Sequence, residues 1–266
     1  MTIRRRHPWR KYTAIMAASA RQTIAQRGEL AGRVIFYFAI LFVFAHFWET
    51  VLAMDTGLRY TREQMLWYLT ITEWVVLSLP DVYLRIEEDA RSGNVGSRLS
   101  RPVSYFGERL AEGAGSHIVR LVVMGLAGAI GTTLLVGSPP TGGALVALAV
   151  TGSLASALGL LFVTAIGVTA IWLHDITPVY WVWQKLLFIL GGLILPLEIY
   201  PSWLSSLASW TPFHPMLYRV GQNVLEPDGA RAASTAIVQL TWIGVLTVGL
   251  FWIQRRALDH VTRVGG

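Results

Sequence analysis

The chain has 266 residues, of which 53% are hydrophobic and only 14% are charged, and its mean hydropathy is +0.49. Soluble domains contain roughly 25% charged residues, so this composition indicates a polytopic membrane protein. The absence of cysteine excludes disulfides, thiolate metal sites and cysteine nucleophiles. The net charge of +6 does not indicate nucleic acid as a partner here, because basic residues of membrane proteins gather beside anionic lipid on the cytoplasmic side.

The first 33 residues are strongly basic and carry eight Lys and Arg residues. The first apolar run starts only at Val34, too late for a signal-peptide h-region, and no A-x-A-like cleavage site follows it, so we expect no processing. Trp9, Tyr12 and Met16 recur at i, i+3 and i+7, which predicts an amphipathic helix over residues 9–26 in the membrane interface. A disordered basic tail is the alternative only for the residues before this helix.

Six apolar segments follow, each close to the roughly 20 residues that a helix needs to cross a bilayer. They cover residues 34–53, 65–84, 118–136, 144–173, 179–197 and 232–253. We therefore expect an all-α polytopic membrane protein with six transmembrane helices, forming a single transmembrane domain over residues 1–266. The fourth segment is longer than one crossing needs, so we expect it to tilt or to project from the bilayer.

Counting Lys and Arg predicts the orientation. With the N-terminus inside, the cytoplasmic segments are 1–33, 85–112, 174–178 and 254–266, and the outer segments are 54–64, 137–143 and 198–231. The first set holds sixteen Lys and Arg residues and the second set holds four. Both termini are therefore predicted to be cytoplasmic. Arg120 and Lys185 fall inside spans near their cytoplasmic ends, where long side chains can snorkel to the interface.

The polar segment 85–112 between the second and third spans contains ten of the 38 charged residues. We expect helix to continue from the second span to about Ser92 and to stop at Gly93 and Asn94, which tolerate left-handed backbone. Pro102 is suited to restart a helix, since the first helical position needs no N–H donor. The segment is either an ordinary charged loop or a docking elbow for a soluble partner.

The segment after the fifth span is apolar and aromatic but is interrupted by prolines. They are Pro196, Pro201, Pro212 and Pro215. No single helix can run through them, so we expect short, re-entrant-like helices at the outer face over residues 198–231. Backbone that enters a membrane without spanning it must be covered by protein or line a cavity.

Patterns of enzyme sites do not occur in this sequence. It lacks H-E-x-x-H, G-x-S-x-G and paired-carboxylate motifs, and its scattered histidines do not form a metal site. We therefore predict no catalytic residue, no metal and no cofactor in this chain. Its two lysines do not lie in a Gly-rich phosphate loop, so any ATP must be bound by another subunit.

Two acids lie within the predicted spans. Glu73 is near the middle of the second span, and Glu49 is in the outer half of the first. A carboxylate at such a depth costs about 2.5–3.5 kcal/mol, so it should face protein or water. Glu73 either attracts a cationic substrate or a proton, or forms a buried hydrogen-bonded contact that fixes helix packing.

Two stretches resemble the permease subunits of ABC-2-type transporters. IEEDARSGNVGSRLSRPVS is similar to the family's acidic-R-S-G…L-x-R-P-V-S cytoplasmic loop. GGLILPLEIYPSWLSSLASWTPFHPMLY is similar to its proline- and tryptophan-rich turn after the fifth span. The resemblance covers nearly the whole chain and is closest to the branch in which two related permeases are paired. The elbow's NVGSR departs from the more apolar run expected there.

The resemblance implies a multi-pass protein of the bacterial cytoplasmic (inner) membrane. Its partners would be two copies of an ABC ATPase and a second permease, homologous or identical, and ATP and Mg would bind only to the ATPase. The coupling loop 85–112 and the interfacial helix would contact that ATPase. The contacting residues expected are Trp9, Tyr12, Glu87, Glu88, Asp89 and Arg91.

The resemblance also implies a path between the two permeases, lined by the first, second and fifth spans. Its candidate residues are Glu49, Glu73, Trp181 and Trp183. The short outer helices would shape an outer gate. Its candidates are Pro201, Trp203, Trp210 and Pro212.

The function implied is ATP-driven export of an amphipathic or hydrophobic compound, for example a drug-like cation. One alternative is an ion-coupled secondary transporter that uses the intramembrane carboxylate of Glu73. Another is a membrane scaffold or enzyme that does not transport.

Overall fold

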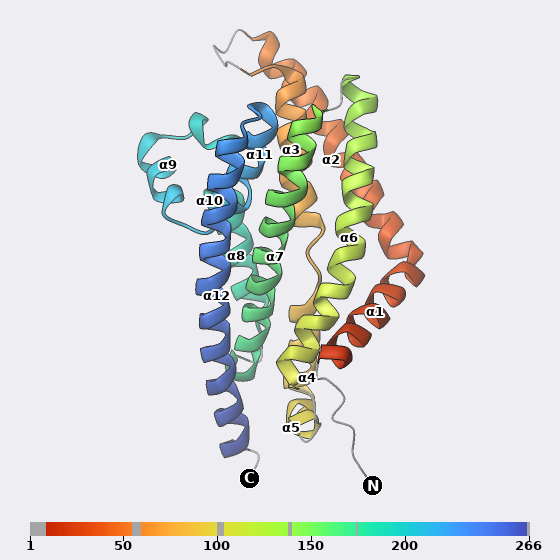
Figure 1. The fold of residues 1–266 in the computed structure, drawn as a ribbon, viewed down its shortest axis with the longest axis vertical. Helices are drawn as coiled ribbons and strands as arrows, with labels where there is room; N and C mark the ends of the chain where they lie inside the picture. The colour runs from red at the N-terminus through yellow and green to blue at the C-terminus, as the bar shows by residue number, and fades with distance from the viewer. Residues whose placement is uncertain (1–8, 55–59, 100–103, 138–139, 174, 265–266) are drawn as a thin grey trace.

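The computed structural model describes residues 9–54, 60–99, 104–137, 140–173 and 175–264. These residues form twelve α-helices and one short 3-10 helix (Figure 1). Their order is α1 (Trp9–Ala25), α2 (Arg27–Ala53), α3 (Arg62–Leu77), α4 (Val82–Arg91), α5 (Asn94–Leu99), α6 (Tyr105–Val136), α7 (Gly142–Leu173), α8 (Thr177–Leu190), η1 (Leu197–Ile199), α9 (Ser202–Ser209), α10 (Phe213–Met216), α11 (Tyr218–Leu225) and α12 (Gly229–Val264). The predicted all-α class and the N-terminal helix are confirmed.

Four helices of the described chain are long and apolar enough to cross a membrane: α2, α6, α7 and α12. They correspond to the predicted first, third, fourth and sixth spans. α12 has 36 residues, which is about 54 Å of helix and longer than the roughly 30 Å hydrocarbon core. Its last turns therefore extend beyond the length that a bilayer requires.

The predicted second span is interrupted. α3 ends at Leu77, and α4 begins at Val82 after Pro80, so the continuous helix expected as far as Ser92 is wrong. Proline has no N–H and disfavours helical backbone at the residue before it. With 16 residues, α3 is about 24 Å long, which is shorter than a full crossing.

The predicted fifth span is also shorter than expected. α8 ends at Leu190, and Gly192 has a positive φ of +63, which helix does not allow. Six complete crossings therefore stay a prediction, because four helices of the described residues have the length and composition to cross.

The segments expected on one side of the membrane lie at one end of the molecule. Figure 1 shows α1, α4, α5, the start of α6 and the end of α12 at the lower end. The ends of α2 and α6, together with α9 and α11, lie toward the opposite end. This separation agrees with an arrangement in which the basic segments share one side.

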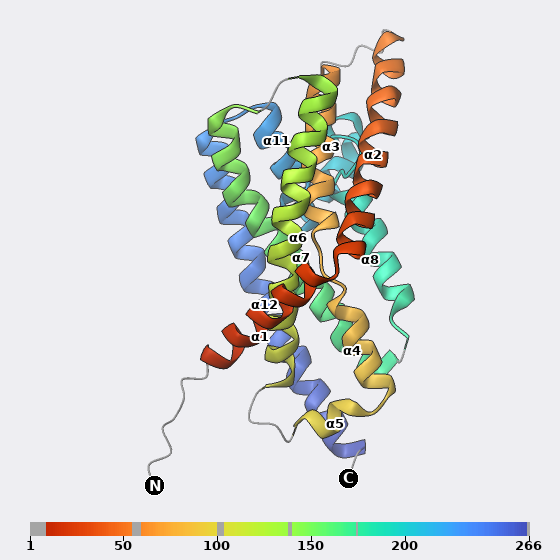
Figure 2. The same ribbon diagram turned by 90° about the vertical axis from the view of Figure 1, so that its right-hand side faces the viewer.

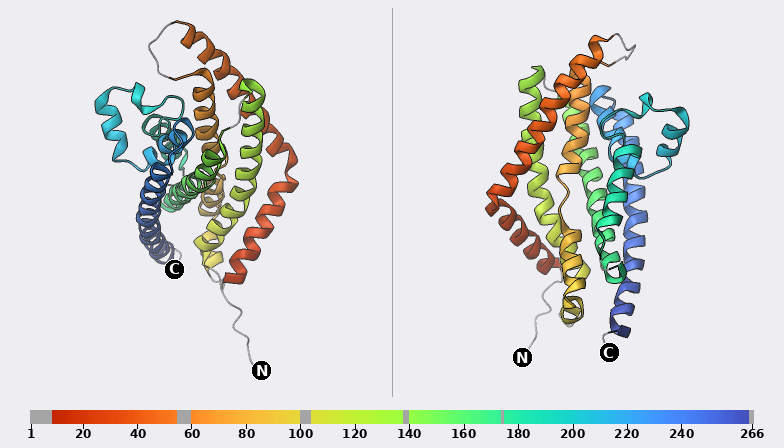
Figure 3. Two further views of the ribbon diagram at one scale, coloured as in Figure 1. Left: turned by 45° about the horizontal axis from the view of Figure 1, so that its top comes forward. Right: turned by 180° about the vertical axis from the view of Figure 1, so that it is seen from behind.

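The short helices α3 and α8 lie with α2 on one face. Seen from behind, these three helices stand in front of α6 and α7 (Figure 3). α1 makes an angle with α2 and crosses the lower half of α6 (Figure 2). The helices that correspond to the first, second and fifth predicted spans thus share one side of the molecule.

Glycines on α6 and α7 accommodate aromatic side chains from α2 and α3. A Cβ on Gly152 would overlap the Trp74 ring, and a Cβ on Gly128 would overlap the Tyr37 ring. The Trp74 indole donates to Leu121 O at 2.8 Å, which fixes it between α6 and α7. The small residues noted in these spans therefore make room for rings as well as for close helix approach.

Candidate coupling site and translocation face

The charged segment 85–112 is helical over most of its described length. It contains most of α4, all of α5 and the first two turns of α6, and we call it the elbow. Gly93 ends α4 with φ +70, as its sequence predicted. Asn94 starts α5 and does not extend the stop. Pro102, expected to restart a helix, lies outside the described residues. The elbow therefore consists largely of two short helices and the start of α6.

α4 presents only part of its charge at the surface. Glu88 and Arg91 are exposed, whereas Glu87 and Asp89 are each only 6% exposed. Glu87 Oε1 forms an ion pair with Arg91 Nη2 at 2.7 Å. Of the four ATPase contacts predicted on this helix, Glu88 and Arg91 are open to a partner, while Glu87 and Asp89 face the chain itself.

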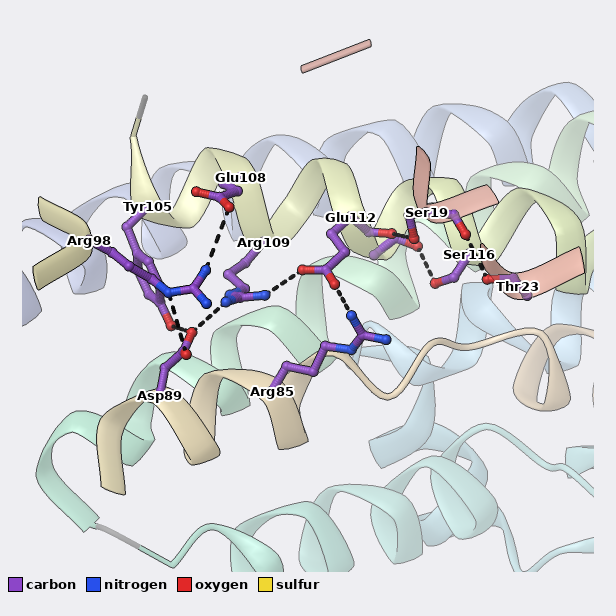
Figure 4. A network of polar contacts seen from close by, with 11 residues as sticks. Ser19, Thr23, Arg85, Asp89, Arg98, Tyr105, Glu108, Arg109, Glu112 and Ser116 are labelled. Carbon is purple, nitrogen blue, oxygen red and sulfur yellow. Dashed lines mark hydrogen bonds and ion pairs between the residues drawn. The ribbon is translucent and has the colours of Figure 1, made fainter. Parts of the chain in front are cut away.

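A network of charges within the elbow joins α4 and α5 to the start of α6 (Figure 4). We call it the elbow network; its members are Arg85, Asp89, Arg98, Tyr105, Glu108, Arg109 and Glu112. At its centre Arg109 Nη2 donates to Asp89 Oδ2 at 2.6 Å, and both side chains are buried. Tyr105 Oη donates to the same oxygen at 2.7 Å, and Arg98 Nε lies 3.6 Å from Asp89 Oδ1. Removing one partner of a buried ion pair costs about 3–5 kcal/mol, so α4 and α6 are held as one unit.

Glu112 extends the elbow network to α1. Its carboxylate accepts from both Arg85 and Arg109, and its backbone carbonyl accepts from Ser19 Oγ at 2.7 Å (Figure 4). Arg85 belongs to α4 and Ser19 to α1. One residue of α6 thus connects both predicted ATPase-contacting helices.

α4 also packs on α7 and α8. Ile86 is fully buried and lies against Gly167 of α7, where a Cβ would press on its side chain. Tyr83 stacks on Tyr180 of α8 with ring centroids 4.2 Å apart. α4 is therefore in contact with α6, α7 and α8 through different side chains, so a displacement of α4 moves or strains all three.

Asp175 provides a weaker link between α4 and the turn before α8. Arg91 Nη2 lies 3.7 Å from Asp175 Oδ1, and the backbone N–H of Thr177 donates to that oxygen at 3.0 Å. The hydrogen bond from Thr177 lowers the pKa of Asp175, so its carboxylate stays ionised opposite Arg91. Both side chains are more than half exposed, so this ion pair contributes little stability.

A second cluster surrounds the break between α3 and α4. Because α3 stops before α4 begins, the backbone carbonyls of Ser78 and Leu79 lack the N–H partners that a continuous helix would give them. Two buried side chains of α6 take their place: His117 Nδ1 lies 2.8 Å from Ser78 O, and Arg120 Nη1 donates to Leu79 O at 2.9 Å. An interrupted helix is tolerated in a membrane protein where neighbouring groups satisfy the freed backbone.

Arg120 also ties the break to the start of α2. It donates to Asp81 Oδ2 at 3.0 Å and to Glu29 Oε1 at 2.6 Å, and Arg33 of α2 donates to the same two oxygens. We call Glu29, Arg33, Asp81, His117 and Arg120 the break cluster. The expectation that Arg120 snorkels to the interface is wrong, because its side chain is 7% exposed and engaged within the protein.

Side chains of α3 likewise hydrogen-bond to backbone carbonyls that follow the early end of α8. Thr72 Oγ1 donates to Leu193 O at 2.7 Å, and Tyr68 Oη donates to Gly192 O. Both donors are buried. α3 therefore connects the break that follows it to the end of α8.

The two ATPase contacts predicted on α1 differ in their exposure to solvent. Trp9, its first residue, is 76% exposed. Tyr12 packs on Gly107 of α6, where a Cβ would crowd the Tyr12 ring. Ser19 and Thr23 are the buried residues further along the helix. Trp9 is therefore open to a partner, while Tyr12 contributes to packing within the chain.

The four predicted path residues do not share one surface. Glu73 is 7% exposed and makes no hydrogen bond or ion pair within the described residues. Glu49 is exposed and lies 3.6 Å from Arg62 Nη2. Trp181 is 54% exposed, whereas Trp183, two residues later on α8, is buried. Only Glu49 and Trp181 are open to a partner or substrate in this arrangement.

The predicted outer gate is centred on α9, which projects from the helical body (Figure 1). Pro201 precedes α9 and Pro212 precedes α10. Trp203 is 67% exposed and Trp210 is 83% exposed. The four residues thus frame one projecting helix, and their role as a gate stays a prediction.

Several contact residues were not singled out from sequence. Arg109 and Glu112 recur at i, i+3 on one helix face, which was the local signal available for the elbow network. The Tyr83–Tyr180 stack joins residues distant in sequence and leaves no local signal. His117 was likewise not recognised, because the break that it satisfies was not expected.

Charges of the described chain form ion pairs that join its helices. No group of three or more His, Asp or Glu side chains there could hold a metal ion. Most charges at the elbow instead pair with one another in the elbow network and the break cluster. These contacts can hold helices together and transmit displacement.

Comparison with known proteins agrees with this arrangement. Residues 34–263 match a family described as ABC-2 family transporter protein. The matched range includes α4, the elbow network and all four long apolar helices except the first turns of α2 and the last residue of α12. A search of curated protein sequences finds no match. On the family match, the chain belongs to the ABC-2 family of transporter proteins.

Proposed function

We propose that this chain is the transmembrane permease subunit of an ATP-driven ABC-2-type exporter in the bacterial cytoplasmic membrane. It moves an amphipathic or hydrophobic compound, while a separate ATPase subunit binds ATP and Mg²⁺ and hydrolyses the nucleotide. Family membership supports the transport function. The complex contains two ATPases and a second permease, identical or homologous, with the substrate path between the permeases.

The observation that carries the proposal is the position of α4. It exposes Glu88 and Arg91 at one end of the molecule, while Asp89, Ile86 and Tyr83 connect it to α6, α7 and α8. An ATPase that binds the exposed side and closes on ATP displaces α4. Because packed helices move as rigid elements, that displacement reaches the membrane helices.

The arrangement of the helices supports a path on the face that carries α2, α3 and α8 (Figure 3). α3 and α8 are the two short helices, and α4 contacts α8 directly. Movement of the elbow therefore acts on a helix of this face. A second permease placed against it encloses the substrate between the two subunits.

Charge reversal at the elbow tests the proposal. Glu88→Arg should reduce the yield of the permease–ATPase complex on co-purification, with unchanged membrane insertion. Glu63→Arg makes the same change on an exposed residue in the first turn of α3, at the opposite end, and should leave complex yield unchanged. Equal yields for Glu88→Arg and wild type would argue against docking at α4.

The buried carboxylate of Glu73 favours one alternative, an ion-coupled secondary transporter. It is 7% exposed, and the described residues supply it with no hydrogen bond or ion pair. The two functions differ in their energy source. Vanadate-sensitive transport by the complex supports the exporter, whereas transport driven by a proton gradient with the purified chain alone supports the alternative.

A further inference from the structure

The chain contains only two lysines, and one of them lies on the proposed translocation face. Lys185 is in the middle of α8, eight residues after its first residue, Thr177. Its side chain is exposed. The exposed neighbours on the same helix are apolar: Trp181, Val182, Leu186 and Ile189. A single cation is thus placed within an otherwise apolar helix surface.

The ammonium group of Lys185 lies between two aromatic side chains of α8. Its Nζ lies 5.3 Å from the ring centroid of Trp181, one turn nearer the start of the helix. It lies 5.5 Å from the ring centroid of Phe188, almost one turn further along. The ammonium thus lies beside two aromatic rings of its own helix. Snorkelling of Lys185 to the interface stays a prediction.

This position is unfavourable for a lipid-facing cation. Charged side chains within a membrane face protein or water, and cation–π contacts offset only part of the cost of desolvation. No carboxylate of the described residues forms an ion pair with Lys185. α8 itself contains no acid, so a copy of this helix packed against it would not supply the missing negative charge.

We propose that Lys185, framed by Trp181 and Phe188, binds the carboxylate or phosphate group of an amphipathic substrate. The inference rests on the proposed function, which places α8 on the substrate path. Charge complementarity identifies the anionic group, and the two rings provide an apolar surface for the part of the substrate beside it. An ammonium on a flexible stem has three donors and can accept either anion.

Reductive methylation of the purified chain in phosphatidylcholine nanodiscs tests the site without the ATPase. Lys11, the other lysine, is the internal reference for each mass-spectrometric measurement. Dodecyl phosphate should slow methylation of Lys185 relative to Lys11 by about tenfold, because a charge-assisted contact with the anion shields the amine. Dodecyltrimethylammonium has the same chain length and the opposite charge, and it should not slow the reaction.

Three results would overturn the proposal: no protection, equal protection of both lysines, or equal protection by the cationic amphiphile. Phosphatidylglycerol added to the nanodisc identifies any contribution from anionic lipid. If this lipid alone protects Lys185 as well as dodecyl phosphate does, the lysine is a lipid contact and the substrate site is refuted.

Variants in the complete permease–ATPase complex provide the second test. Lys185→Gln should raise the dodecyl phosphate concentration that half-maximally stimulates ATP hydrolysis by about tenfold, whereas Lys185→Arg should retain the response. Arg256→Gln is the matched control, because that guanidinium lies 3.9 Å from the ring centroid of Trp252 on α12. An unchanged response in Lys185→Gln would refute the site. Failure of the complex to assemble would count against the proposed function, while the methylation result still decides the anion site.

Discussion

Tyr83 of α4 stacks on Tyr180 of α8, with ring planes inclined by 10° and centroids 4.2 Å apart. The two helices come from the two predicted spans that the structure shows to be short or interrupted. α4 is thus joined to α6 by buried charges and to α8 by an aromatic contact. These two links can be removed separately, so their contributions to transport can be distinguished.

Replacing Tyr83 tests the aromatic link. Tyr83→Ala removes a ring pair worth about 0.5–1.5 kcal/mol beyond its buried area, while the buried ion pair of Asp89 and Arg109 still holds α4 to α6. We expect normal yield of the permease–ATPase complex and continued ATP hydrolysis, with slower substrate transport into inverted vesicles. Tyr83→Phe retains the ring and should transport at the wild-type rate. Equal transport by the alanine variant would show that α8 is not driven through this contact.

A double-mutant cycle tests the buried charges of the elbow network. Arg109→Met leaves the Asp89 carboxylate buried without its closest cation and should destabilise the protein by about 3–5 kcal/mol. Asp89→Leu combined with Arg109→Met removes both charges and should be less destabilising than the single change. Denaturation in nanodiscs provides the measurement. If the two losses simply add, the pair is not energetically coupled.

The fold class was predictable because apolar runs mark membrane helices directly. Four of the expected spans correspond to long helices, and α1 occupies almost the range that the spacing of Trp9, Tyr12 and Met16 predicted. Gly93 ends α4 where its backbone tolerance suggested. These features depend on local sequence, which is why composition, periodicity and turn residues were sufficient.

The breaks in the second and fifth spans were not predicted, because hydropathy measures how apolar a segment is and not whether its helix is continuous. Pro80 lies inside the predicted second span, between Leu79 and Asp81, and α3 ends before it. The groups that satisfy the backbone carbonyls there, His117 and Arg120, are distant in sequence and required the packed structure. Burial of Glu87 and Asp89 was also unforeseen, since a charged run looks solvent-exposed until its partners are placed.

The break cluster should depend more on Arg120 than on proline. Arg120→Met removes the donor to Leu79 O and the buried contacts to Asp81 and Glu29, so we expect a loss of about 3–5 kcal/mol. Pro80→Ala leaves all these contacts in place and should change stability by less than about 1.5 kcal/mol. Denaturation of both variants in the same nanodiscs compares them. A larger loss for Pro80→Ala would show that the proline, and not the ion contacts, maintains the break.

Glu73 is the acid whose role on the path can be separated from its role in packing. Glu73→Gln keeps the side chain's shape and removes its charge, so assembly with the ATPase should be unaffected. If the carboxylate attracts the cationic part of a substrate, transport of dodecyltrimethylammonium into inverted vesicles should fall about tenfold, the size expected for one charged contact. Glu63→Gln on the same helix is the control, because that residue is exposed in the first turn of α3. Equal transport by Glu73→Gln and wild type would assign the buried acid to helix packing, and the exporter would then have to recognise its substrate without it.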